Sequence, residues 1–380
     1  MRATDLYITF YRIHGGLLSI YNEYSFLKRK KGTYKDVFIS LDLGIDELGD
    51  ILSPLLSEAK NIYVSVLSYE MITLLYPLID ERWIIGGNIW YQNIKEIDEG
   101  FTPSMLRELG AKEIHVPLEL YFNPKGELST VFEYYFKDLV ESIPHQALSY
   151  SVSLGYGCHW RRCTFCIYSL SGMCFSIRKN ISSVISQIPL HSQGKTTDIH
   201  TCLPAIPGHM LGEVLSAGWN SHHIPVLFIR ADEESLRALS SLKGSDVDCR
   251  NRKFSIGMEI LSDSALNILN KGTTVNYILG VTELILSQGG MVELSIMTGY
   301  SFLTPQIIDE AQIGYRRLKK IFKQYKGPEN YLWIVNYGDV EPPVSGIPMD
   351  EIIKSAKDSL QVAYNATIKE FVIDTGITIF

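Results

Sequence analysis

Three cysteines, Cys158, Cys163 and Cys166, are the residues of this 380-residue chain whose type and spacing most clearly indicate chemistry. They lie in the segment SLGYGCHWRRCTFCIYS, with four residues between the first two and two between the last two. Three thiolates can bind three irons of a [4Fe–4S] cluster and leave the fourth iron open for a substrate or cosubstrate. Because only six cysteines occur in the whole chain, their crowding indicates a metal site rather than a disulfide framework.

Three other interpretations of this spacing stay open. Plant-type [2Fe–2S] ferredoxins share the spacing and take a fourth ligand far downstream, which here would be Cys202 or Cys249. A structural zinc site could be completed by Cys174 or His159. The cysteines could also bind no metal and pack as small apolar side chains.

The elements that must position the cysteines form an alternating series of apolar strands and helical segments beginning at residue 148. We expect strands at 150–154, 197–202, 225–229, 254–258, 291–297 and 331–335. We expect helices near 180–188, 208–217, 233–242, 262–270 and 304–325. Six such units fit a partial (β/α)6 barrel, and the cysteine segment follows the first strand, where barrels place their chemistry.

An earlier series occupies the first part of the chain, with strands expected at 36–41, 61–67, 82–85 and 113–117 and a helix at 71–79. Near-continuous apolar strands separated by helices are typical of a parallel sheet covered on both faces. The fold class is therefore α/β. We expect a Rossmann-like domain over 1–147, the partial barrel over 148–341, and a small extension over 342–380 with a helix from about 350 to 364 and a final β-like run.

The bulk composition excludes some classes of function. The formal net charge is −7, which argues against nucleic-acid binding as the main activity. No charged n-region precedes an apolar segment at the start, and no window approaches ~20 uninterrupted apolar residues. We therefore expect a cytoplasmic protein with no membrane and no nucleic-acid partner.

The cysteine segment resembles the signature of the radical SAM superfamily, in which Cys, three residues, Cys, two residues and Cys carry an aromatic residue just before the last Cys. That aromatic residue is Phe165 here. The first gap is one residue longer than usual, and it contains Trp160. A similar longer, Trp-containing gap occurs in the cobalamin-dependent branch and in some peptide-modifying members.

A second segment carries the same resemblance. FSIGMEILSDSALNILNKGTT, at 254–274, is similar to the fourth barrel strand and following helix of the superfamily, with its Gly-x-Glu, Ser-Asp and Asn-Lys-Gly. Ser262 or Asp263 would cap that helix, and Gly272 would end it. GGMVELSIMTGYSFLT, at 289–304, resembles the fifth strand and its turn.

The resemblance implies a set of roles. The three cysteines would hold the cluster, and its open iron would take the amino and carboxylate groups of S-adenosylmethionine (SAM). Reduction then gives methionine and a 5′-deoxyadenosyl radical. Phe165 would pack near the adenine, and Arg230 would form a forked contact with the SAM carboxylate. Glu259 would accept hydrogen bonds from the SAM amino group or ribose, with Gly257 allowing close approach.

Some expected features are weaker. The second barrel strand of the superfamily normally leads into a Gly-Gly-Glu-like clamp, but TDIHTCLP stands here, so Thr201, Cys202 and Leu203 are at best backbone substitutes. Tyr337 and Asp339, which follow the sixth strand, are candidates for substrate contact or catalysis.

The segment RWIIGGNIW, at 82–90, resembles the strand and turn that close the cobalamin-binding domain of the B12-dependent branch. Gly86 and Gly87 would let the backbone approach a flat ligand at the carboxyl edge of the sheet. The Asp-x-His-x-x-Gly motif that supplies a cobalt ligand in many cobalamin proteins is absent. Cobalamin therefore either binds without a His ligand, as this branch allows, or does not bind.

These alternatives lead to different reactions. With cobalamin, we expect methyl transfer to an unactivated carbon or phosphorus centre in a natural-product or peptide substrate. Without it, the chain would be a radical SAM mutase, epimerase or peptide-modifying enzyme. A non-enzymatic iron–sulfur carrier or sensor is the third hypothesis. Either enzyme would need an electron donor such as flavodoxin or ferredoxin.

Overall fold

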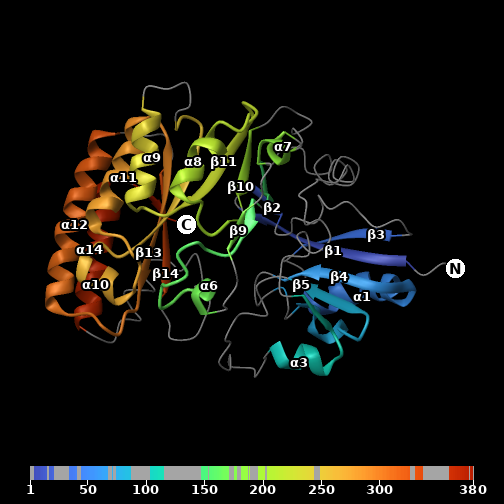
Figure 1. The fold of residues 1–380 in the computed structure, drawn as a ribbon. Coiled ribbons are helices and arrows are strands. Elements are labelled where there is room, and N and C mark those ends of the chain that lie inside the picture. The colour runs from blue at the N-terminus through green and yellow to red at the C-terminus, as the bar shows by residue number, and fades with distance from the viewer. Residues whose placement is uncertain are drawn as a thin grey trace. The chain divides into compact units, whose positions relative to one another are not determined.

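The structure is a computed structural model (Figure 1). It describes residues 4–14, 17–20, 34–40, 44–66, 71, 74–86, 103–114, 147–152, 154–170, 175–177, 181–186, 188, 196–201, 203–243, 249–325, 330–336, 359–375 and 377–379. Among these residues, none of the helices combines the length and apolar character that crossing a bilayer requires.

The chain divides into two compact units. The first comprises Met1–Tyr156, Ile177–Cys202 and Asn220–Ile224, and the second comprises Gly157–Ser176, Leu203–Trp219 and Pro225–Phe380. The three cysteines thus belong to the second unit. The division into three domains that we expect from the sequence remains a prediction.

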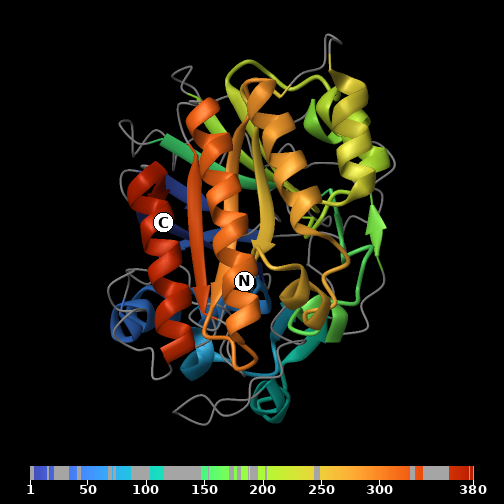
Figure 2. The ribbon, with the colours of Figure 1, turned by 90° about the vertical axis from the view of Figure 1, so that its left-hand side faces the viewer.

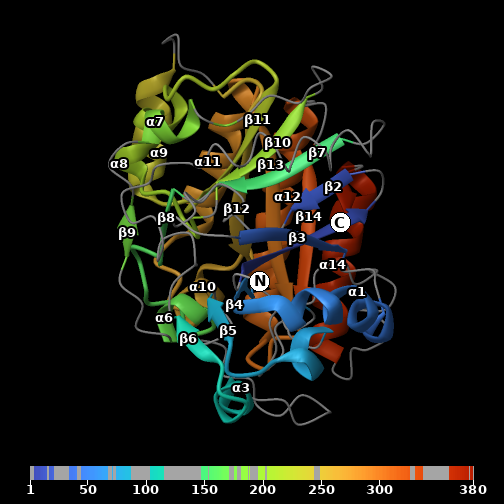
Figure 3. The same ribbon diagram turned by 90° about the vertical axis from the view of Figure 1, so that its right-hand side faces the viewer.

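The first unit is built on a sheet with the long strand β1 (Thr4–His14) near its centre. Figure 3 labels the strands β2, β3 and β4 that pair with β1. β1 pairs in parallel with β3 and β4, and antiparallel with β2. The pairs β4–β5, β5–β6, β2–β7 and β7–β10 are also parallel. The strand bounds are β2 Leu17–Ile20, β3 Tyr34–Ser40, β4 Ala59–Ser65, β5 Trp83–Gly86, β6 Lys112–Ile114, β7 Ala147–Val152 and β10 Thr197–Thr201.

Helix α1 (Ile45–Glu58) packs on this sheet through Leu48 and Leu52, which are fully buried. Short helical segments complete the first unit: η2 (Tyr76–Leu78), α3 (Pro103–Glu108) and α7 (Ile181–Ile185). The helix expected at 71–79 ends in the 3₁₀ turn η2, where Pro77 supplies no backbone N–H for an α-helical bond. The four expected strands of this unit are confirmed, but β1 was not predicted.

The second unit has a parallel sheet of five strands among the described residues. Their order is β11 (His223–Ile229), β12 (Lys253–Glu259), β13 (Met291–Thr298), β14 (Tyr331–Asn336) and β15 (Thr378–Ile379). The first residues of β11 belong to the first unit. Helices cover one face of the sheet (Figure 2). Their bounds are α8 Gly208–Leu215, α9 Glu233–Leu242, α10 Asp263–Ile268, α11 Val275–Ser287, α12 Pro305–Gln324 and α14 Ser359–Thr375.

Most residues of β11, β12 and β13 are buried, and Val226, Phe254, Ile256 and Leu294 are fully buried. This is the burial that a parallel sheet requires. Short strands β8 (Gly155–Tyr156) and β9 (Ser176–Ile177) precede and follow the three cysteines, and helix α6 (Ile167–Leu170) begins directly after Cys166. The α/β class and all six strands expected of the partial barrel are confirmed.

Two sequence predictions need correction. Helix α11 was not predicted, although its buried residues recur at helical spacing. The helix predicted from about 350 to 364 extends in the structure to Thr375, and residues 351–358 lie outside the described part. Several β-branched residues near its end favour a strand locally. Packing of Tyr364, Ile368 and Phe371, all buried, overrides that preference.

Candidate functional site

Residues 158–166 form a short loop of the second unit, the cysteine loop, which carries three free thiols. Cys163 is buried, with 6% of its surface exposed, and Cys158 and Cys166 are partly buried. Burial raises the pKa of the Cys166 thiol, and the neighbouring Cys163 and Cys158 raise it further. The three sulfurs are therefore close enough to interact electrostatically. Among the described residues, no three His, Cys, Asp or Glu side chains are gathered around a position for one metal ion.

Two cations face this loop. Burial raises the pKa of the Cys163 thiol, whereas the charges of Lys271 and Arg230 lower it. Positive charge stabilises thiolate, which is the form that binds iron. The loop thus lies where negative charge on the sulfurs is partly compensated.

The loop is fastened to the turn that follows helix α10. The Thr164 backbone N–H donates to the Leu269 carbonyl at 3.0 Å, and the Trp160 indole N–H donates to the Asn270 carbonyl at 2.8 Å. Asn270 and Gly272 both have left-handed backbone conformations, with φ of 48° and 66°. These φ values end α10 and turn two carbonyl groups toward the cysteine loop.

Glu259 is the last residue of β12 and also lies in the left-handed region, with φ of 61°. The β12–β13 register shifts between Gly257 and Glu259, so the strand bulges there. The Glu259 carboxylate is buried and forms an ion pair with the ammonium group of Lys271. A Cβ on Gly257 would lie 2.7 Å from Glu259 Oε1 and 2.8 Å from Lys271 Nζ. Only glycine leaves space for this pair.

Arg230 follows β11, whose parallel neighbour is β12, so Arg230 and Glu259 occupy the same edge of the sheet. The guanidinium is 6% exposed and its Nε donates to Asp232 at 3.3 Å. Its Nη2 donates to the carbonyl groups of Lys271 and Gly272. Arg230 therefore holds the turn after α10 in place.

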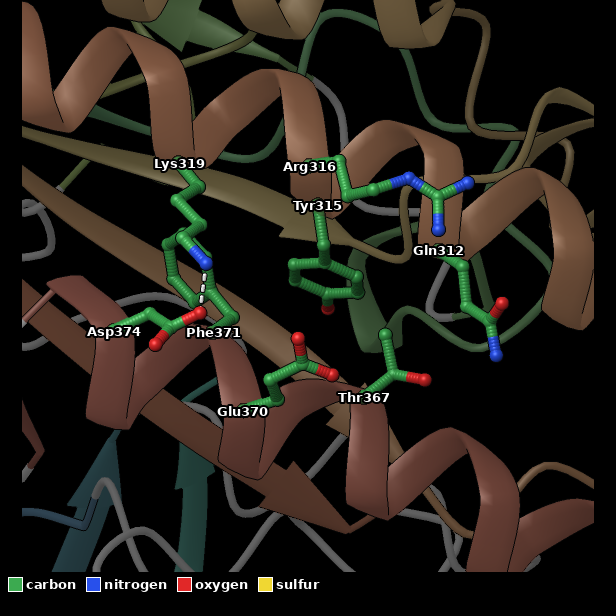
Figure 4. A pocket seen from close by; sticks show the side chains of 8 residues that line it. All are labelled: Gln312, Tyr315, Arg316, Lys319, Thr367, Glu370, Phe371 and Asp374. Carbon is green, nitrogen blue, oxygen red and sulfur yellow. Dashed lines mark hydrogen bonds and ion pairs between the residues drawn. The ribbon is translucent and has the colours of Figure 1, made fainter.

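Helix α14 packs against helix α12 through aromatic side chains. The Tyr364 ring lies tilted against the rings of Tyr300 and Tyr315, and its hydroxyl lies 3.3 Å from that of Tyr315. Burial raises the pKa of Tyr364 far above its usual value, and the charge of Glu259 adds to this effect. Figure 4 shows Tyr315 of α12 directed toward α14 beside the Lys319–Asp374 ion pair. These contacts attach the end of the chain to the unit that carries the cysteines.

Comparison with known proteins identifies the architecture. No protein-family model and no curated protein matches the chain. The structure resembles TsrM from Kitasatospora setae, a radical SAM methyltransferase with cobalamin and a [4Fe–4S] cluster bound, with a TM-score of 0.52 and 14% identity over 88% of this chain and 75% of that one. It also resembles OxsB, a cobalamin-dependent SAM radical enzyme with aqua-cobalamin and SAM bound, with a TM-score of 0.53 and 14% identity over 99% of this chain.

The chain has the fold of cobalamin-dependent radical SAM enzymes. It spans 57% of the length of OxsB. A sequence identity of 14% shows a shared fold and no shared activity. The resemblance found in the sequence to that branch is therefore matched by the three-dimensional structure.

Within this fold, the predicted site residues divide into two groups. The structure brings together the three cysteines, Arg230, Gly257 and Glu259 in the second unit, together with Phe165, whose ring lies 5.6 Å from the Lys271 ammonium. Thr201 ends β10 and Gly86 ends β5, and both are buried in the first unit. Gly87, Tyr337 and Asp339 lie outside the described residues, as do Cys174 and Cys202.

Sequence reasoning missed two residues of the site. Lys271 was noted only as part of a helix-ending Asn-Lys-Gly, yet it pairs with Glu259. Trp160 was noted only as part of a long gap, yet it contacts the turn after α10. Two features of the sequence could have indicated them. Lys271 stands between two residues that end a helix, and Trp160 is an aromatic residue between two cysteines.

Proposed function

We propose that this protein is a radical SAM enzyme in which Cys158, Cys163 and Cys166 hold a [4Fe–4S] cluster. The observation that supports this most strongly is the attachment of the cysteine loop to the turn that carries Lys271, the partner of Glu259. A thiol site for iron and a carboxylate site for a cationic cosubstrate thus share one structural element. Neither a ferredoxin nor a zinc module requires that second site.

The donor set fits such a cluster. Three free thiols on one loop match the three protein ligands of an open-site cluster, and the charges of Lys271 and Arg230 lower the pKa of the Cys163 thiol against the effect of its burial. With SAM bound, the reduced cluster would supply a 5′-deoxyadenosyl radical.

The chain's own residues would bind and orient SAM. Glu259 would accept hydrogen bonds from the SAM amino group or ribose hydroxyls, because its carboxylate lies at the carboxyl end of β12. Phe165 would pack near the adenine. Arg230 would contact the SAM carboxylate in addition to its bonds to the turn after α10. Thr201 would offer backbone groups.

We further propose that the reaction is cobalamin-dependent methyl transfer to an unactivated centre of a small molecule or peptide, with electrons from flavodoxin or ferredoxin. The support is the fold, together with Gly86 at the carboxyl end of β5, where its carbonyl accepts from Val66 N–H at 2.8 Å. Gly87 would widen this approach, and Tyr337 and Asp339 would face substrate. The missing Asp-x-His-x-x-Gly motif favours the alternative of a radical mutase, epimerase or peptide-modifying enzyme without cobalamin.

Replacing each cysteine of the loop with alanine tests the cluster. After anaerobic reconstitution, the parent protein should bind about four irons and absorb broadly near ~400 nm. Each of Cys158→Ala, Cys163→Ala and Cys166→Ala should lose most of this iron and absorbance. Cys249→Ala is the matched control, because Cys249 is also a buried cysteine outside any disulfide but lies outside the loop. Equal iron loss in Cys249→Ala and the loop variants would contradict the assignment.

A further inference from the structure

The Trp160 indole lies between two cations and a glycine. The Arg230 guanidinium carbon is 4.7 Å from the ring centroid, and that of Arg162 is 5.0 Å away. Such distances are those of cation–π contacts. On Gly272, a Cβ would lie 2.5 Å from the Trp160 Cε2 atom, so the ring rests directly on the backbone of this glycine.

The turn at 269–272 also contacts the residues that we propose for SAM binding. Arg230 donates to the carbonyl groups of Lys271 and Gly272, while the Lys271 side chain pairs with Glu259. On the other side of the turn, Trp160 and Thr164 donate to the carbonyl groups of Asn270 and Leu269. The turn at 269–272 is therefore contacted from the cysteine loop and from the end of β12.

We propose that Trp160 is a positioning residue that seats the cysteine loop on Gly272 and thereby fixes the cluster relative to the SAM-binding end of β12. This inference rests on the proposed function and assigns a role to a residue of the long first cysteine gap. Trp160 is the second of the four residues between Cys158 and Cys163, and its indole donates to the Asn270 carbonyl of the turn. Trp160 acts through this contact and takes no part in the chemistry.

The first test uses the apo-protein, so it does not depend on activity. The alkylation rate of Cys163 by iodoacetamide is measured by mass spectrometry, with Cys249 in the same chain as the internal reference. Trp160→Phe removes the indole donor to Asn270 and keeps an aromatic ring. Loss of one hydrogen bond, ~1 kcal/mol, should raise the Cys163 rate roughly fivefold and leave the Cys249 rate unchanged.

Trp219→Phe is the matched control. The Trp219 indole also donates to a backbone carbonyl, that of Val214 at 2.8 Å, but this carbonyl belongs to helix α8 and not to the turn at 269–272. This variant should leave the Cys163 rate at the parent value. Equal rates of Cys163 alkylation in Trp160→Phe and the parent would overturn the proposal.

A double-mutant cycle tests the contact with Gly272. Gly272→Ala should loosen the loop in the parent, because its Cβ would collide with the indole. In a Trp160→Ala background the same substitution should change the Cys163 rate much less, since only backbone strain remains. Identical effects of Gly272→Ala in both backgrounds would show that the ring and the glycine are not coupled, contrary to the proposal.

A spectroscopic measurement separates positioning from simple folding. Trp160→Phe should retain the iron content of the parent, but the SAM-induced change in the electron paramagnetic resonance spectrum of its reduced cluster should need roughly fivefold more SAM. An unchanged SAM requirement would contradict the role of Trp160. If the parent bound no cluster at all, the proposed function would fail, and the alkylation rates would still decide the Trp160 contact.

Discussion

At the scale of single residues, the position of Glu259 depends on the absence of a side chain at Gly257. Glu259 adopts a left-handed backbone, which costs a non-glycine residue on the order of 1 kcal/mol or more. Its carboxylate and the Lys271 ammonium fill the space that a side chain at Gly257 would occupy. A strained residue at a bulged strand end, with a buried charge pair beside it, is typical of a ligand-binding position.

Gly257→Ala should therefore weaken SAM binding. The new Cβ would come within 2.8 Å of both charged groups and displace the Glu259–Lys271 pair. We expect the dissociation constant for SAM to rise about tenfold, which corresponds to ~1.4 kcal/mol, in calorimetric titrations of the reconstituted protein.

Gly212→Ala is the control for this substitution. Gly212 lies in helix α8, and a Cβ added there would have no atom within 4 Å, so alanine should leave SAM affinity unchanged and stabilise the helix by up to ~1 kcal/mol. Unchanged SAM affinity in Gly257→Ala would contradict the role given to this strand end.

The sequence predicted part of this site. Gly257, Glu259, Arg230 and the cysteines were identified because their types are informative within a motif. Lys271 was missed because its pairing with Glu259 depends on where α10 ends and which way the turn points. Those features depend on the φ angles of Asn270 and Gly272, which a residue pattern does not specify.

At the scale of elements, side-chain hydrogen bonds to the starts of two helices hold the segment after β12 in place. Ser262 accepts from the Ala265 N–H and caps α10, while Asp263 accepts from the Val275 N–H at 2.7 Å, at the start of α11. Glu310 of α12 in turn accepts from the hydroxyls of Ser262 and Ser264 at 2.6 and 2.7 Å. These bonds fix α10 between its neighbours, and therefore fix the turn on which the cysteine loop rests.

Glu310→Gln should destabilise the protein in a pH-dependent way. Burial raises the pKa of Glu310, but hydrogen bonds from Ser262 and Ser264 outweigh it and hold the pKa at about 2, below the usual 4.5. The depressed pKa means that the stabilisation is complete above about pH 5 and is lost as the pH falls toward 2. Allowing for solvent screening of a half-buried group, we expect a loss of about 1–2 kcal/mol near neutral pH.

Urea unfolding at about pH 6.5 and about pH 3.5 measures this difference. Asp309→Asn serves as the control, because Asp309 is the exposed neighbour on the same helix. A difference in the free energy of unfolding between Glu310→Gln and the parent that stays constant over this pH range would exclude the carboxylate as its cause.

The elements themselves were largely predictable. Strands β11 to β14 were each predicted from their apolar residues and flanking turn residues. The sequence predicted a cap at Ser262 or Asp263, and Ser262 supplies it. Strand β1 was missed although LYITFYRI is rich in β-branched and aromatic residues. The end of α14 was misplaced because tertiary packing on α12 outweighs local preference there.

At the scale of the whole molecule, the two units carry separate proposals. The cysteines, Arg230 and Glu259 belong to the second unit, whereas Gly86 belongs to the first. Loss of cobalamin binding would therefore leave the cluster proposal intact. No sequence pattern could settle cobalamin binding, because the motif that would name a cobalt ligand is absent.

Purification in the presence of hydroxocobalamin tests the first unit. We expect about one cobalamin per chain to be retained after gel filtration, measured by its visible absorbance. Gly86→Val should reduce this retention, because a branched side chain at the carboxyl end of β5 would hinder a flat ligand. Cys158→Ala, which alters only the other unit, should retain cobalamin fully. Retention of none by the parent would remove the methyl-transfer proposal and favour the cobalamin-independent alternative.

The central claim is that this chain uses an iron–sulfur cluster to cleave SAM. Its most direct test is to reduce the anaerobically reconstituted protein with SAM present and to measure 5′-deoxyadenosine by chromatography and mass spectrometry. We predict that the parent and Cys249→Ala release deoxyadenosine and that Cys158→Ala releases none. Iron-loaded parent protein that releases no deoxyadenosine, with or without candidate substrates, would contradict the claim.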